Sequence, residues 1–166
     1  MKNRNTVKKY ADYLENSFLL FTTNRFSYSL KQQFVSNKKV YCIDNGMVRS
    51  IAFRFSENKG KFLENLAFLE LRRKYPDIYY YKTSNNLEVD FLVREGRKNR
   101  ALIQVTQGLG NEKTRQREIA ALVQGMSELK IKKALILTED SEERIKEKNK
   151  LITVKPIYKW IVEDMS

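Results

Sequence analysis

The chain has 166 residues, of which 32 are Lys or Arg and 20 are Asp or Glu, giving a formal net charge of +12. Hydrophobic residues make up 42% of the sequence, which is enough for one ordinary domain with a small appendage and excludes a disordered chain. The absence of histidine excludes imidazole-dependent catalytic triads and histidine zinc sites. Any chemistry must use carboxylates, amides, hydroxyls and lysine.

Cysteine usage, hydropathy and charge indicate the environment of the chain. Cys42 is the single cysteine, so we expect a reducing, cytoplasmic location. The sequence shows neither a signal peptide nor a membrane span, so no membrane partner is expected. Residues 1–75 carry 15 basic and 6 acidic side chains, whereas residues 76–166 carry 17 and 14. This charge favours nucleic acid as partner, with a solvated lysine-rich surface as the alternative.

The N-terminal segment predicts a helix followed by a hairpin. From residue 5 to residue 16, apolar side chains recur at helical spacing. The run Phe18–Phe21 and the alternating apolar residues of 26–30 then predict two short strands.

The remaining chain predicts an α/β sandwich, in which a mixed sheet is flanked by helices. Helical spacing covers residues 60–75 and 112–129, and Pro156 opens a short closing helix. A charged loop or helix is expected after Thr138 and up to Lys150. The expected strands are 40–43, 78–82, 87–93, 101–105, 133–138 and 151–154.

The strand sequence Leu87–Val93 carries two acids at alternate positions. A period of two places Glu88 and Asp90 on one face and the apolar residues Val89, Phe91 and Val93 on the other. A wet sheet edge with ordinary exposed acids is the simpler interpretation.

Further oxygen atoms can join these acids. On the adjacent strand Gln104 and Thr106 share one face, so Gln104 neighbours Asp90 if the strands pair. Glu64 lies at the border of the apolar face of the preceding helix. Carboxylate and amide oxygens in such a group are typical ligands of magnesium or manganese.

The arrangement resembles the PD-(D/E)xK nuclease-like superfamily. More narrowly, it looks like the nuclease-like C-terminal domain, a domain of unknown function, of archaeal-type AAA+ ATPases. The residues that carry this resemblance are GKFLENLAFLELRR, IYYYKTSNNLEVDFLV, ALIQVTQGL, KTRQREIAALVQG, KKALILTED and ITVKPIYKWIVED. NTVKKYADYLENSFLL is similar to the tail of the winged-helix segment that usually precedes that domain. The resemblance therefore implies a partial winged-helix segment over residues 1–37, a restriction-endonuclease-like sandwich over residues 38–166, and a truncated chain.

The resemblance also implies roles for individual residues. Glu64 matches the helix acid and Asp90 the metal-binding aspartate, while Gln104 and Thr106 stand at the acid and the lysine of (D/E)-x-K. The implied metal ligands are Glu64, Asp90 and Gln104, with Mg or Mn as the ion if one is needed at all. Because a carboxylate and an ammonium are missing from the motif, we expect that catalysis is lost.

Other charged residues can replace those missing from the motif. The candidates are Lys82, Arg115, Arg117 and Glu118, although Arg117 and Glu118 can equally form a surface network. No phosphate-binding loop of the form G-x-x-x-x-G-K-[ST] occurs, so this chain is not expected to hydrolyse ATP.

The sequence therefore predicts a non-catalytic nucleic-acid-binding or regulatory module of an AAA+ ATPase, with DNA preferred and no cofactor required. A metal-dependent nuclease that cleaves phosphodiesters is the first alternative. A protein-interaction module using Tyr79–Tyr81, or Phe53 and Phe55, is the second. The expected phosphate contacts are Lys8, Lys9, Lys38, Lys39, Arg72, Arg73 and Lys74.

Overall fold

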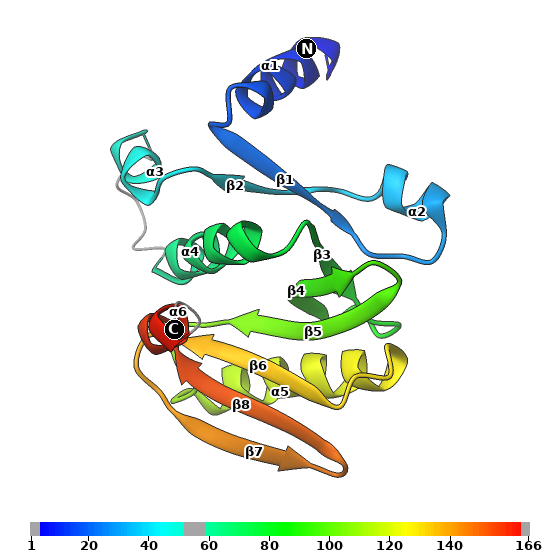
Figure 1. Ribbon diagram of the computed structural model, residues 1–166, viewed down its shortest axis with the longest axis vertical. Coiled ribbons are helices and arrows are strands. Elements are labelled where there is room, and N and C mark those ends of the chain that lie inside the picture. Colours follow the sequence, from blue (N-terminus) through cyan, green and yellow to red (C-terminus); the bar gives the residue numbers. More distant parts are fainter. Residues whose placement is uncertain (1–3, 52–58, 164–166) are drawn as a thin grey trace.

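The computed structural model describes residues 4–51 and 59–163 (Figure 1). Its strands are β1 Leu20–Arg25, β2 Lys39–Cys42, β3 Asp77–Lys82, β4 Glu88–Glu95, β5 Lys98–Val105, β6 Lys133–Thr138, β7 Glu143–Glu147 and β8 Lys150–Pro156. Its helices are α1 Arg4–Asn16, α2 Leu30–Val35, α3 Asn45–Ile51, α4 Lys59–Lys74, α5 Glu112–Glu128 and α6 Ile157–Glu163.

The strands of these two ranges form one eight-stranded sheet in the order β2-β1-β3-β4-β5-β6-β8-β7. β3, β4 and β5 make the predicted antiparallel meander, and β6 and β8 continue it in parallel. The predicted mixed α/β architecture with flanking helices is therefore confirmed (Figure 1). Within the described ranges, no helix combines the length and the hydropathy needed to cross a bilayer.

The sheet has an apolar core on each face. On one face Leu102 packs with Leu122 of α5, and on the other Ile103 packs with Phe68 of α4. Gly125 lets α5 approach the sheet closely, because a Cβ atom there would lie 3.1 Å from Cδ1 of Leu102. The alternation along β5 thus divides its side chains between the two cores, as predicted.

Helix α4 confirms the helix predicted over residues 60–75 and gives Glu64 an unexpected environment. Ala67, Phe68 and Leu71 form its buried stripe. Glu64 belongs to the same stripe because it precedes these residues by three, four and seven positions. Its side chain is therefore buried on the side of α4 that faces the sheet, whereas the sequence placed it at the border of the apolar face.

The N-terminal segment differs from the prediction after α1. The second strand of the expected hairpin, over residues 26–30, does not form. Residues 30–35 form α2, and β1 pairs with β2 instead. The cause is Ser29, whose hydroxyl accepts the backbone N–H of Gln32 and caps a new helix where apolar alternation favoured a strand. The expected boundary between residues 37 and 38 falls in the connection from α2 to β2, and this division stays a prediction.

The charged stretch before Lys150 contains a strand, β7, instead of the loop or helix predicted for it. β7 lies at the edge of the sheet and pairs with β8. Ile145 is its single buried residue, so hydropathy gives almost no strand signal. Charged side chains are ordinary on edge strands, where they discourage pairing with other chains.

A bulge in β4 breaks the predicted alternation. The register between β3 and β4 shifts between Tyr79 and Tyr81, so that β4 carries one extra residue at this point. Val89 consequently packs on the α5 face, whereas Phe91 and Val93 pack on the α4 face. The prediction that these three residues share one face is wrong.

Candidate functional site

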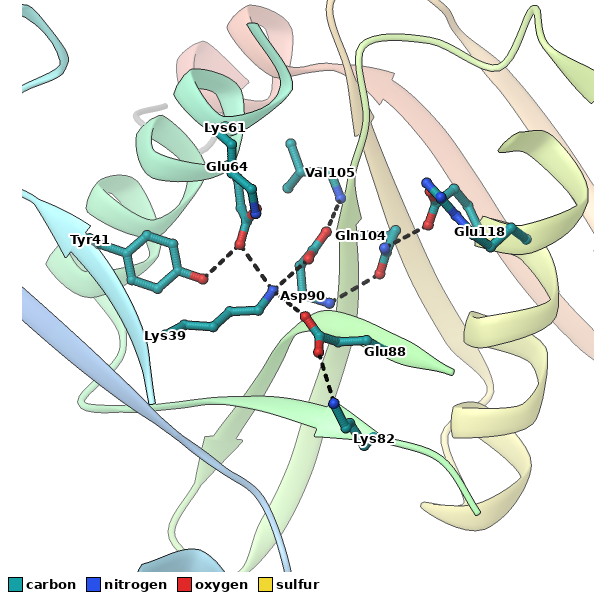
Figure 2. Close-up of polar contacts among 11 residues, drawn as sticks. Lys39, Tyr41, Lys61, Glu64, Lys82, Glu88, Asp90, Gln104, Val105 and Glu118 are labelled. Carbon is teal, nitrogen blue, oxygen red and sulfur yellow. Dashed lines mark hydrogen bonds and ion pairs between the residues drawn. The ribbon is translucent and has the colours of Figure 1, made fainter. Parts of the chain in front are cut away.

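The ammonium group of Lys39 lies at the centre of an acidic cluster (Figure 2). Its Nζ donates hydrogen bonds to Oε1 of Glu64 at 3.0 Å and to Oδ1 of Asp90 at 2.7 Å. It also forms an ion pair with Oε1 of Glu88 at 3.0 Å. The side chains of Lys39, Glu64 and Asp90 are 16%, 9% and 12% exposed, whereas that of Glu88 is 39% exposed. Lys39 together with Glu64, Glu88 and Asp90 is called the Lys39 cluster below.

Strand β2 supplies two of the donors to Glu64. Lys39 and Tyr41 lie two residues apart and therefore point to the same face of β2. The hydroxyl of Tyr41 donates to Oε1 of Glu64 at 3.0 Å, beside the Lys39 ammonium. Lys61, one turn earlier in α4, contacts Oε2 at 3.0 Å from a position where its side chain is 74% exposed. Both oxygens of Glu64 thus have hydrogen-bond donors.

Asn65 fixes the end of β2 against α4. Its Oδ1 accepts the backbone N–H of Cys42 at 2.8 Å, and its Nδ2 donates to the carbonyl of Cys42 at 2.9 Å. The side-chain amide thereby satisfies both backbone groups of a strand residue. Adjacent residues of α4, Glu64 and Asn65, both hold β2 in place.

Asp90 lies at the bulge of β4 and is held from β5. Its Oδ2 accepts the backbone N–H of Val105 at 3.0 Å, and its own N–H donates to Oε1 of Gln104 at 3.0 Å. The side-chain amide of Gln104 then donates to Oε2 of Glu118 in α5 at 2.6 Å. Gln104 therefore links the backbone of Asp90 to Glu118 and does not face the Lys39 ammonium (Figure 2).

The predicted metal ligands are brought together only in part. Glu64 and Asp90 converge on Lys39 as expected, but the oxygen of Gln104 is engaged by a backbone N–H. Among the residues that the structure describes, no group of three or more Asp, Glu, Cys or His residues has a spacing suited to a metal ion. In this arrangement the residues do not fit the metal that the resemblance implies.

The other motif and replacement residues have different partners, and of these only Lys82 is paired with a member of the Lys39 cluster. Thr106 donates from its hydroxyl to the carbonyl of Gly108 at 3.4 Å and makes no contact with the carboxylates. Lys82 approaches Oε2 of Glu88 at 3.7 Å. Arg117 pairs with Glu118, which is 3% exposed. Arg115 is held away by Glu143 in β7.

Burial and charge set the protonation of the Lys39 cluster. Burial alone would lower the pKa of Lys39. The nearby carboxylates of Asp90 and Glu64 have the larger effect, so the pKa of Lys39 is raised. Burial raises the pKa of Asp90 to about 6, with Lys39 acting against it. The pKa of Glu64 is lowered, because Lys39 and Lys61 overcome its burial. Burial and the Glu64 charge raise the pKa of Tyr41, which therefore remains a neutral donor.

The predicted phosphate contacts occupy different environments. Lys8, Lys9 and Lys38 are exposed. Lys39 begins β2, one residue before the strand expected over 40–43. Its ammonium faces carboxylates, so this arrangement does not offer it to phosphate. The remaining three lie in the last turn of α4: Arg72 is exposed with its guanidinium 4.0 Å from the centre of the Phe21 ring, Arg73 pairs with Glu70, and Lys74 lies over Trp160.

The aromatic residues considered for a protein interface are mostly part of the core. Tyr80 is buried, and Tyr79 and Tyr81 pack against the core on the α5 face. Phe53 and Phe55 lie outside the described residues.

Sequence reasoning missed Tyr41 as a site residue and assigned Lys39 to phosphate instead of to this acidic cluster. Their signal was the alternation Lys39-Val40-Tyr41, which places a lysine on the same strand face as a tyrosine. The local sequence does not show which face of a short strand is buried. That this face of β2 is buried becomes clear only from the position of α4.

Comparison with known proteins assigns the chain to a family. A family model described as a domain of unknown function, DUF4143, matches residues 59–160. The chain belongs to the DUF4143 family. Residues 1–58 match a second model, described as the domain of unknown function DUF8612. The predicted resemblance to a domain of unknown function is thus confirmed, while its nuclease-like identity stays a prediction.

The curated proteins that the chain matches are longer than the chain. An uncharacterised protein of Methanocaldococcus jannaschii is 36% identical over 168 residues, covering 95% of this chain and 36% of that protein. An uncharacterised protein of Haemophilus influenzae is 31% identical over 93 residues, covering 56% of this chain and 23% of that protein. The chain therefore spans roughly a third or less of the length of these relatives.

One solved structure is weakly similar. It is a half-complex from a tetradecameric assembly of Thermococcus gammatolerans McrB AAA+ hexamers with bound McrC. The TM-score is 0.43 with 12% identity, and the match covers 59% of this chain and 28% of that chain.

Replacing Lys39 tests the electrostatics of the site. Lys39→Ala leaves two buried carboxylates without their shared ammonium, which should cost about 3–5 kcal/mol of unfolding free energy at about pH 8. Without the ammonium, the folded state binds protons more tightly than the unfolded state, so stability falls as pH rises through the raised carboxylate pKa values. In urea unfolding, the loss of unfolding free energy caused by Lys39→Ala should therefore be smaller at about pH 5 than at about pH 8.

Lys61→Ala is the matched control, since Lys61 also contacts Glu64 but is exposed. It should cost about 0–1 kcal/mol at either pH. Equal losses for the two variants, or no pH dependence for Lys39→Ala, would contradict the assigned role of Lys39.

Proposed function

We propose that this chain is the nuclease-like domain of an AAA+ family ATPase, that it does not cleave phosphodiester bonds, and that it binds nucleic acid through phosphate contacts. Residues 1–37 are proposed as the remnant of a winged-helix segment and residues 38–166 as a restriction-endonuclease-like sandwich. The sequence segments that resemble such domains support the ATPase association, and the greater length of the relatives leaves room for an ATPase part.

The observation that carries the loss of cleavage is the position of the Lys39 ammonium. Metal-dependent hydrolysis needs an ion that activates water and stabilises charge on the phosphate. The carboxylates available for that ion already bind Lys39, and both oxygens of Asp90 have donors. Lys39 remains protonated beside them, so it cannot accept a proton from water.

Exposed basic residues near the N-terminus support the binding of nucleic acid. Lys8 and Lys9 lie on α1 and Lys38 lies just before β2. These residues belong to the half of the chain that holds most of its excess positive charge. Contacts of this kind neutralise phosphates without reading bases, because lysine side chains on a surface offer charge but no fixed geometry.

A protein-binding role is the second candidate, favoured by exposed apolar side chains. All but two of the large hydrophobic residues exposed in the described ranges lie between Val7 and Met47. Tyr10 of α1 is 64% exposed and Phe34 of α2 is 86% exposed. Apolar surface of this extent is typical of interfaces.

DNA binding and its salt dependence test the proposed partner. The triple variant Lys8→Ala, Lys9→Ala, Lys38→Ala should bind duplex DNA more weakly than the wild type in fluorescence anisotropy titrations. The slope of log K against log salt should become less steep by about 0.9 for each phosphate that the variant no longer neutralises.

The control triple variant replaces Lys132, Lys146 and Lys148 by Ala. All three lysines are exposed: Lys146 lies in β7, Lys148 lies between β7 and β8, and the carbonyl of Lys132 accepts the N–H of Leu151 in β8. β7 and β8 lie far from α1 in Figure 1, and the replacement removes the same charge. The control should retain the wild-type slope. Wild-type binding without steep salt dependence would instead favour the protein-binding role.

Incubation with plasmid DNA distinguishes the proposal from an active nuclease. With Mg²⁺ or Mn²⁺ present, the wild type should leave supercoiled plasmid intact, because no described group is arranged to hold an activating metal ion. Cleavage that disappears in Asp90→Ala would establish the nuclease alternative and refute this part of the proposal.

A further inference from the structure

The contacts of Lys39 are those of a cation enclosed by oxygen atoms. Its partners come from separate elements, since Glu64 belongs to α4 whereas Glu88 and Asp90 belong to β4. Lys39 itself arrives from β2, and Figure 2 shows its ammonium between these carboxylates. A lysine ammonium has three N–H donors, which matches the number of carboxylates placed around it here.

Carboxylates brought this close need a positive charge between them. Without one, burial and mutual repulsion would favour their neutral forms. In many proteins a divalent ion supplies that charge, with oxygen ligands at about 2.0–2.6 Å. The distances of 2.7–3.0 Å around Nζ of Lys39 are those of charge-assisted N–H···O contacts instead.

We propose that the Lys39 ammonium is the permanent cation of the Lys39 cluster, in the place of a divalent metal ion, and that shortening this side chain creates a divalent-cation site between Glu64, Glu88 and Asp90. The wild-type protein accordingly needs no metal ion to hold α4, β2 and β4 together. The site that the nuclease resemblance assigns to a metal is filled by the chain itself.

The position of Lys39, not lysine content in general, gives it this role. Lys61 also contacts Glu64, but its side chain is 74% exposed and it approaches from outside the cluster. Lys82 lies 3.7 Å from Glu88 and is 36% exposed. Lys39 combines the lowest exposure of the three with contacts to Glu64, Glu88 and Asp90.

This inference deepens the proposed absence of cleavage but depends only on the contacts around Lys39. DNA binding by α1 can fail while the inference holds. The experiment therefore measures metal-dependent thermal unfolding without any nucleic acid present.

Wild type, Lys39→Ala and Lys61→Ala are unfolded by heating in millimolar MnCl₂ and, separately, in NaCl of equal ionic strength. The midpoints of the wild type and of Lys61→Ala should be the same in both salts. The midpoint of Lys39→Ala should rise by about 5 °C or more in MnCl₂, because an ion that binds only the folded state stabilises it. Adding Asp90→Asn to Lys39→Ala should abolish the rise.

Each other result overturns the inference. If MnCl₂ raises the unfolding midpoint of the wild type, the metal binds while Lys39 is present. If MnCl₂ leaves the midpoint of folded Lys39→Ala unchanged, the three carboxylates do not form a cation site. A rise that survives Asp90→Asn places the ion elsewhere. If Lys39→Ala does not fold in NaCl, the readout is refolding from urea: recovery in MnCl₂ supports the inference and failure in both salts contradicts it.

Discussion

The position of β2 against α4 and β4 depends on one ion cluster. In it the Lys39 ammonium donates hydrogen bonds to the buried acids Glu64 and Asp90 and forms an ion pair with the more exposed Glu88. It connects three elements that are far apart in the sequence: β2, α4 and β4. Since the pairing of β1 with β3 spans only two residue pairs, side-chain contacts must also hold the β1–β2 ribbon in position. They are the ion cluster, the hydrogen bonds of Asn65, and the packing of Phe21 and Tyr41 on Phe68. Such a cluster specifies one arrangement of charges, because removing Lys39 leaves the buried carboxylates of Glu64 and Asp90 without their shared ammonium.

The same cluster decides what this arrangement of acids can do. A sheet that places acids from a helix and a strand side by side is suited to metal binding in principle. Here those acids are paired with Lys39, and Gln104 serves as a link between the backbone of Asp90 and Glu118. The cluster therefore serves the fold, and the proposed interaction with other molecules is assigned to the exposed basic and apolar side chains near the N-terminus.

Much of the fold was predictable because periodicity reports burial within one element. Residues 60–75 as a helix and 133–138 as a buried strand followed from their apolar spacing. The approach of Glu64 to Asp90 was expected from the resemblance to the nuclease-like superfamily. The burial of Lys39 was not predictable in this way, since it depends on which helix covers a short strand. The bulge beside Asp90 arises from the pairing of β3 with β4. β7 escaped prediction because an edge strand needs little apolar surface.

The most direct test of the role of Lys39 is diffraction from crystals of the wild-type protein grown in MnCl₂, measured at the manganese absorption edge. If Lys39 is the permanent cation of its cluster, the maps should show density for its side chain reaching Asp90 and Glu64, and no anomalous peak between these carboxylates. An anomalous peak there, with the ammonium displaced, would contradict that role.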